Sequence, residues 1–211
     1  MGKFCYNHKF RGLVGDKVYF KRADEYFARI RVDNVKASNE ESAVARRLQF
    51  GAIGKLARAM KYVTTVGFPG RPKRETATNA FVRLNYNCCT VDDVATEAVT
   101  IDYPGLVFAD GVLEVPRVTA SFEEAGHSLS FSVTAASRTY GGCMPTDKVY
   151  TVVVDEERNR AVLEELGTRG EGGIKTVDLD DTWKKEKLHV YVFCTDEKGR
   201  EASSSLHLTL A

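Results

Sequence analysis

Apolar residues at helical spacing between Ser38 and Phe68 constrain the fold of this chain more than any other stretch. They recur every three or four residues and predict one long amphipathic helix packed on a core. Ser38 followed by Glu41 favours a capping box at the start, and Gly67 before Phe68 and Pro69 favours a left-handed stop. The apolar positions are Val44, Leu48, Ala52, Leu56, Ala59, Met60 and Val63.

Gly51 and Gly54 interrupt this pattern. Each costs on the order of 1 kcal/mol relative to alanine in a helix interior. A kink or break is the interpretation we expect; the alternatives are close approach by another segment of the chain, or a surface that admits a partner or a ligand. The segment is not a phosphate-binding loop, because the glycine spacing is too short and Leu56 stands where Ser or Thr would bind magnesium.

The net charge of +1 over 211 residues conceals a strong asymmetry. Residues 1–89 hold 18 Lys and Arg against 7 Asp and Glu, a net of +11, whereas residues 90–211 hold 12 against 22, a net of −10. Such halves suit partners of opposite sign or head-to-tail packing between copies, although each half can also simply be solvated.

The cysteines predict free thiols in a reducing compartment, which we take to be the cytoplasm. Their number is odd, and none are spaced as C-x-x-C. No run of 18 apolar residues exists, so we expect no membrane span, and the N-terminus lacks the apolar stretch of a signal peptide. The five cysteines are Cys5, Cys88, Cys89, Cys143 and Cys194.

The N-terminal part combines a predicted β-hairpin with two helices. Alternation in Leu13–Phe20 and Tyr26–Val32 predicts its two strands, with Arg29 and Arg31 on one face. After the long helix, a basic connector at residues 69–74 is the best local candidate for a phosphate contact, although a solvated loop is the simpler interpretation. A second helix is predicted to begin near Thr76, with Ala77, Ala80, Phe81, Leu84 and Cys88 on one face.

The C-terminal part predicts an antiparallel β-sandwich of the disulfide-free, immunoglobulin or fibronectin type III kind. Asp110-Gly111 predicts a hairpin between 106–108 and 112–115. The fold class is therefore α+β, with a basic domain at 1–110 and a sandwich at 111–211. The predicted strands are Ala98–Tyr103, Ser128–Thr134, Lys148–Val154, Arg160–Leu166, Gly173–Leu179, Leu188–Cys194 and Ser203–Leu210.

Catalytic signatures are missing from the sequence. His189 and His207 are expected to be close, on neighbouring strands, but His8 and His127 lie elsewhere and no zinc ligand set is evident. G-x-S-x-G, H-E-x-x-H and G-x-G-x-x-G are absent, and Cys143 has no local base. We therefore expect no catalytic residue, no metal and no cofactor, and interpret the chain as not an enzyme.

The order of segments resembles a family of uncharacterised proteins common in Bacteroidota, a domain of unknown function. The resemblance covers nearly the whole chain and implies a helical part followed by an immunoglobulin-like sandwich, with no activity attached. The helix start departs from it, since the family tends to carry Thr-x-x-Gln where this chain has Ser38-Asn39-Glu40-Glu41. The similar segments are 10–18, Ile30-Arg31, Arg46, Arg47 and Phe50, 99–103, 111–116, 129–133, and 190–193 with Gly199 and 203–205.

Three functions fit these observations. The first is a non-catalytic structural or interaction protein that binds a protein partner or assembles with itself. The second is nucleic-acid binding by the basic half, and the third is small-molecule or carbohydrate binding through Tyr140, Trp183 and Tyr191. The nucleic-acid hypothesis rests on Arg29, Arg31, Arg46, Arg47, Arg58, Lys61, Arg71, Lys73 and Arg74.

Overall fold

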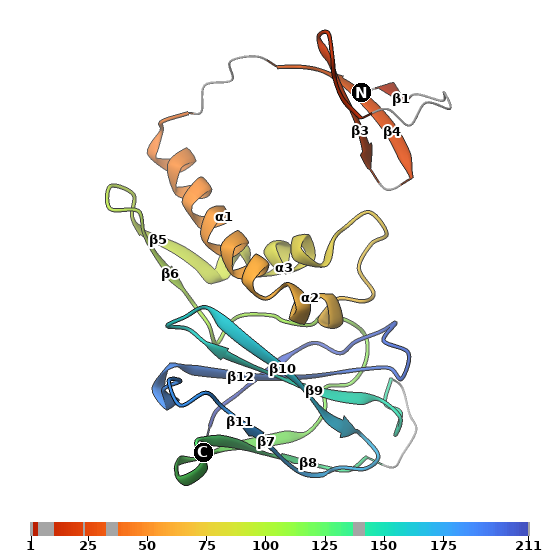
Figure 1. Cartoon of the computed structure of the whole chain (residues 1–211), viewed down its shortest axis with the longest axis vertical. Coiled ribbons are helices and arrows are strands. Elements are labelled where there is room, and N and C mark those ends of the chain that lie inside the picture. The colour runs from red at the N-terminus through yellow and green to blue at the C-terminus, as the bar shows by residue number, and fades with distance from the viewer. Residues whose placement is uncertain (1, 4–10, 23, 33–37, 137–141, 211) are drawn as a thin grey trace.

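A computed structural model of the chain describes residues 2–3, 11–22, 24–32, 38–136 and 142–210. The fold is mixed α and β, strands dominate, and the expected α+β class is confirmed. In Figure 1 a small N-terminal sheet lies at one end of the long axis, two antiparallel sheets lie at the other, and helices lie between them.

The N-terminal sheet contains four antiparallel strands in the order β1-β4-β3-β2; the predicted hairpin is confirmed as β3-β4, but its first strand is divided into β2 and β3. Gly15 takes a positive φ of 59° and turns the chain inside what was predicted as one strand. Lys17 pairs with Val14 on one side and with Ile30 on the other. The strands are β1 (Gly2–Lys3), β2 (Gly12–Val14), β3 (Lys17–Arg22) and β4 (Glu25–Ile30).

The predicted long helix is two helices, α1 (Glu41–Ala59) and α2 (Lys61–Gly67), separated by Met60. Met60 has φ −103° and ψ 26°, outside the helical region. Leu56 and Met60 are buried in one hydrophobic cluster together with Val63 from α2, so the break directs both helices onto the same core.

Both predicted ends of this helical segment need correction. The N-cap is Glu40 without a side-chain cap, and Ser38 Oγ accepts from the Glu40 N–H at 3.2 Å instead of forming a capping box. Gly67 is the last helical residue and lies outside the positive-φ region. A Cβ at Gly67 would overlap the carbonyl oxygen of Phe108, so close approach explains this glycine.

The second predicted helix is confirmed as α3 (Ala77–Asn85). The Thr76 hydroxyl accepts from the Asn79 N–H at 3.1 Å, which caps the helix. Ala80 and Phe81 are buried as expected, and the buried Asn85 amide donates to the Phe81 carbonyl at 2.9 Å. A 3-10 turn, η1 (Tyr86–Cys88), follows.

The C-terminal part forms two antiparallel sheets, in the orders β10-β9-β12-β13 and β11-β8-β7, beside a β5-β6 hairpin. Its 3-10 turns are η2 (Glu124–Gly126) and η3 (Lys185–Lys187). The strands are β5 (Cys89–Asp93), β6 (Ala98–Ile101), β7 (Val118–Glu123), β8 (Ser128–Val133), β9 (Lys148–Asp155), β10 (Arg160–Thr168), β11 (Gly173–Asp178), β12 (Leu188–Thr195) and β13 (Leu206–Leu208).

Two cores lie on the two faces of the sheet that contains β9 and β12. Val152 and Tyr191 belong to the cluster under the helices, whereas Val153 and Val190 belong to the cluster shared with β7, β8 and β11. Burial on both faces explains why β9 reads as a nearly continuous apolar run.

The hairpin predicted around Asp110-Gly111 was wrong. This segment runs beside the chain after β12, where Leu113 N donates to the Ala202 carbonyl at 3.0 Å and Leu113 forms a parallel bridge with Ser203. The Phe108 N–H donates to Ser205 Oγ at 2.9 Å. The segment around Asp110-Gly111 is therefore held by the Ser205 side chain and by pairing with Ser203, and not by a local hairpin.

The first core contains residues from both sides of the domain boundary predicted at residue 110, and that boundary stays a prediction. Among the described residues, no helix is both long enough and apolar enough to cross a bilayer.

Candidate functional site

The nine basic residues predicted as a nucleic-acid site lie in four separate segments. Arg29 lies on β4, with Arg31 just beyond that strand. Arg46, Arg47 and Arg58 lie on α1. Lys61 begins α2, and Arg71, Lys73 and Arg74 lie on the connector before α3.

Several of these side chains are bound to nearby backbone. Arg46 Nε donates to the Ser42 carbonyl at 3.2 Å, and Arg47 Nη1 donates to the Ser38 carbonyl at 2.8 Å. Arg71 donates to backbone carbonyls at both ends of its own loop. The connector is therefore held partly by an arginine that was predicted to contact phosphate.

One ion pair joins this connector to the N-terminal sheet. Arg74 Nη2 lies 3.1 Å from Glu25 Oε2 on β4, and both side chains retain solvent access. Arg71 also borders a cavity of about 280 Å³ between the connector and the chain near Gly111. Arg71 and Arg74 thus lie in one region, the connector before α3, but the nine predicted side chains do not form one cluster.

The N-terminal sheet exposes apolar side chains, and no described residue of β2, β3 or β4 is buried. The register places Val14 and Ile30 on one face, in line across Lys17. These two side chains are 51% and 66% exposed, and Val32 is 68% exposed. On the opposite face the rings of Phe20 and Phe27 stack with centroids 5.7 Å apart.

A groove of about 550 Å³ lies where α1 meets the β5-β6 and β9-β10 turns. This volume is within the range of roughly 300–1,000 Å³ that ligand pockets occupy. Gly51 borders the groove, and a Cβ there would meet nothing within 4 Å. The apolar part of its lining includes Leu48, Ala52 and Leu56 from α1 with Val99 and Ile101 from β6, and its charged part is Arg47, Lys55, Arg158 and Glu97.

The two turns that border the groove share one design. Each loop spans four residues between paired strand residues and begins at an aspartate, Asp93 or Asp155. In both, that carboxylate accepts from the N–H two residues on at 2.9 Å. Glu97 and Asn159, which end the loops and line the groove, have φ of 56° and 51°. Turn chemistry accounts for these left-handed residues.

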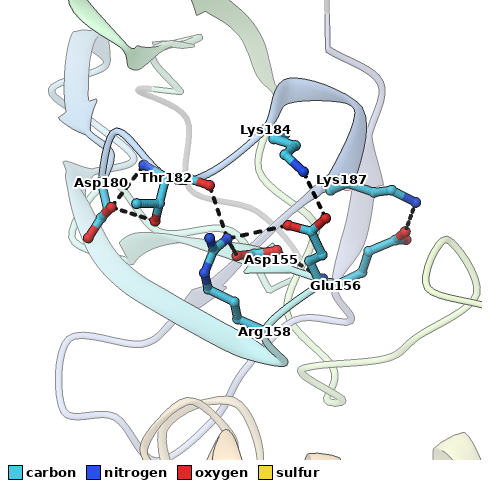
Figure 2. Close-up of polar contacts among 8 residues, drawn as sticks. Asp155, Glu156, Arg158, Asp180, Thr182, Lys184 and Lys187 are labelled. Carbon is cyan, nitrogen blue, oxygen red and sulfur yellow. Dashed lines mark hydrogen bonds and ion pairs between the residues drawn. The ribbon is translucent and has the colours of Figure 1, made fainter.

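A polar network fixes the groove wall at Arg158 (Figure 2). Arg158 Nη1 donates to Asp155 Oδ2 at 2.9 Å and to the Thr182 carbonyl at 3.0 Å, and the Asp155 side chain is fully buried. The pKa of Arg158 is raised, chiefly by its hydrogen bond to Asp155. Lys184 extends the network by pairing with Glu157 at 2.9 Å. Arg158 Nη1 also lies 3.6 Å from Glu157 Oε2, so the Arg158 side chain is held in position and its charge is offset by two carboxylates.

A second cluster, beside this network, contains aromatic and titratable side chains. His189 stacks on Tyr103 with centroids 4.8 Å apart, and its Nε2 lies 2.9 Å from Glu156 Oε2. Hydrogen bonds from His189 and Lys187 lower the pKa of Glu156. Burial raises the pKa of Tyr103 to about 12 and also raises that of Tyr191. The polar atoms and rings of these side chains contact one another, which is typical of a structural role.

The described cysteines are free, as expected, and Cys89, Cys143 and Cys194 are buried. Burial raises the pKa of the Cys88, Cys89 and Cys194 thiols, so none of these three is an activated nucleophile. Cys5 and His8 lie outside the described residues. In the part of the chain that the structure describes, His, Cys, Asp and Glu side chains form no group of three or more that could hold a metal.

The aromatic residues proposed for carbohydrate binding do not form an exposed platform. Trp183 is 6% exposed and belongs to the core between the two sheets, and Tyr191 is fully buried. Tyr140 lies outside the described residues. Sequence reasoning missed Lys55, Glu97 and Arg158 as a group because they come from three segments; the unexplained Gly51 was the one signal that pointed to their groove.

A family model described as a family of unknown function (DUF6266) matches residues 9–209. No curated protein matches the chain, and no solved structure does.

Proposed function

We propose that this chain, which belongs to the family of unknown function DUF6266, is a non-catalytic protein that assembles with further copies of itself. The N-terminal sheet carries the proposal. A small sheet needs to cover an apolar face to be stable, yet no described residue of its strands β2, β3 and β4 is buried. Exposed apolar side chains gathered in this way are typical of a protein–protein contact surface.

Charge supports a second copy as the partner. The N-terminal half has a net charge of +11 and the C-terminal half one of −10. Lys17, which lies between Val14 and Ile30, makes their face basic as well as apolar. A contact between unlike ends of two copies is heterologous, and it produces a ring or a filament according to its rotation.

We also propose that the C-terminal part is an immunoglobulin-like sandwich, a fold that is common in proteins that bind and assemble. Seven strands run from β7 to β13 in this part. Strands β7, β8 and β11, which are the first, second and fifth, form one sheet, and β9, β12 and β13, which are the third, sixth and seventh, belong to the other. Constant-type immunoglobulin domains divide these six strands in the same way. The fourth strand differs, because β10 pairs with β9. We also propose the cytoplasm as the compartment, since the described thiols are free.

Sedimentation velocity over a concentration series tests the assembly. We expect the weight-average sedimentation coefficient of the wild type to rise with concentration and the rise to weaken with added salt. Ile30→Glu should abolish the rise, whereas Phe50→Glu, at a position 59% exposed on α1, should leave it unchanged. A wild type that stays monomeric at low salt, or two variants that behave alike, would contradict the proposal.

Nucleic-acid binding by the N-terminal half is the alternative proposal. The described contacts of Arg46, Arg47, Arg71 and Arg74 are to other residues of the N-terminal half, which favours it, whereas the spread of the nine basic residues over separate segments weighs against a single site. Fluorescence anisotropy of labelled DNA and RNA, titrated with salt, tests it. Binding whose salt slope implies roughly five phosphates supports the alternative, and no binding at low salt removes it.

A further inference from the structure

We infer that the groove bordered by Gly51, Lys55 and Arg158 binds a small organic anion with an apolar body. The inference is independent of self-assembly, because the groove lies between α1, the β5-β6 hairpin and the β9-β10 turn, away from the strands of the N-terminal sheet. Three observations carry it: the cost of Gly51, the charge of the walls, and the composition of the lining.

Gly51 destabilises helix α1 relative to alanine, and no close contact within the chain requires a glycine there. Helix α1 continues through residue 51, so the glycine makes no break in the helix. The nearest atoms to a Cβ at Gly51 lie beyond 4 Å, so no other segment approaches it. At Gly54 the nearest is Arg58 Nη1 at 3.9 Å. The interpretation of Gly51 as part of a surface that admits a partner or a ligand agrees with this open space.

The walls carry three cations and one carboxylate. Arg47 and Lys55 come from α1, Arg158 from the β9-β10 turn, and Glu97 from the β5-β6 turn. The buried Asp155 carboxylate and the Thr182 carbonyl hold Arg158 in place, and Asp155 together with Glu157 offsets its charge. Arg47 and Lys55 therefore supply the excess positive charge of the lining over Glu97, and this excess favours an anion.

The rest of the lining is largely apolar. Leu48 and Leu56 from α1 and Ile101 from β6 border the groove between the charged groups. A hydrated inorganic ion would gain little from such side chains, whereas an aromatic or aliphatic skeleton would gain from their burial. The ligand class that matches both features is a carboxylate or sulfonate on an apolar skeleton.

Titration with anilinonaphthalene sulfonate, a fluorescent aromatic sulfonate, tests the inference on the intact chain. We expect saturable binding at one site, weakened roughly tenfold by Lys55→Glu, because the reversal exchanges an attraction for a repulsion. Gly51→Leu should also weaken binding by filling the groove, while a raised melting temperature shows that the fold is intact, since leucine favours a helix more than glycine.

Two matched variants are controls. Lys61→Glu makes the same charge change on α2 outside the groove lining, and Ile30→Glu alters the exposed face of the N-terminal sheet. Both should bind the probe as the wild type does. No saturable binding, or equal losses in Lys55→Glu and Lys61→Glu, would overturn the inference.

Discussion

His189 and His207 lie side by side on the paired strands β12 and β13, with ring centroids 5.7 Å apart. Burial, followed by the nearby His189, lowers the pKa of His207 below its ordinary value of 6.5, while Asp102 acts in the opposite direction. Tyr191 contacts the same ring edge to face. The folded protein therefore prefers His207 neutral, whereas the unfolded chain protonates it more readily.

This preference predicts stability that falls as the pH drops through about 6.5. His207→Phe keeps a ring on Tyr191 and removes the titration, so the free energy of unfolding should depend less on pH between about pH 7 and pH 5. Urea unfolding at a series of pH values measures this. Equal slopes in the variant and the wild type would contradict the assignment. The lowered pKa of Glu156 adds a separate loss below its ordinary value of 4.5.

The buried ion pair of Arg169 with Asp147 predicts a larger effect. Arg169 Nε lies 3.4 Å from Asp147 Oδ2, and the side chains are 4% and 1% exposed. Arg169→Met should lower the free energy of unfolding by about 3–5 kcal/mol, because it leaves a buried carboxylate unpaired. The double variant with Asp147→Asn should recover part of that loss in guanidinium unfolding. A single-variant loss under about 1 kcal/mol would show that the pair is not buried in solution.

Two glycines in the helical segment predict opposite effects of alanine. Gly51→Ala should raise the free energy of unfolding by about 1 kcal/mol, since the added methyl meets open space in a helix. Gly67→Ala should lower it by about 1–3 kcal/mol, because the added Cβ overlaps the Phe108 carbonyl. Thermal and urea unfolding of both variants check this, and a stabilised Gly67→Ala would disprove the close approach.

Local periodicity predicted most of the strands and the start of α3. The alternation of Ser128–Thr134 and the apolar run of Lys148–Val154 correspond to β8 and β9, and Leu188–Cys194 corresponds to β12. The same strands bring His189 near His207, as expected. The short-range hydrophobic pattern was sufficient there because each strand buries alternate residues in one core or both.

Long-range contacts explain the failures. Ala202 and Ser203 pair with Leu113 across the chain, which removes the hairpin predicted at Asp110-Gly111. The strands β5 and β7 were not predicted at all. The groove combines α1 with two turns distant in sequence, so only the cost of Gly51 pointed to it.

The most direct test of head-to-tail assembly is zero-length carbodiimide cross-linking of a mixture of light and heavy-isotope-labelled chains, read by mass spectrometry. The exposed Lys17 lies on the apolar, basic face of the N-terminal sheet. The account predicts mixed-isotope links from Lys17 to carboxylates within residues 90–211 of another copy. Links confined to one chain, or links from Lys17 only to Asp16, Asp24 or Glu25 of another copy, would contradict it.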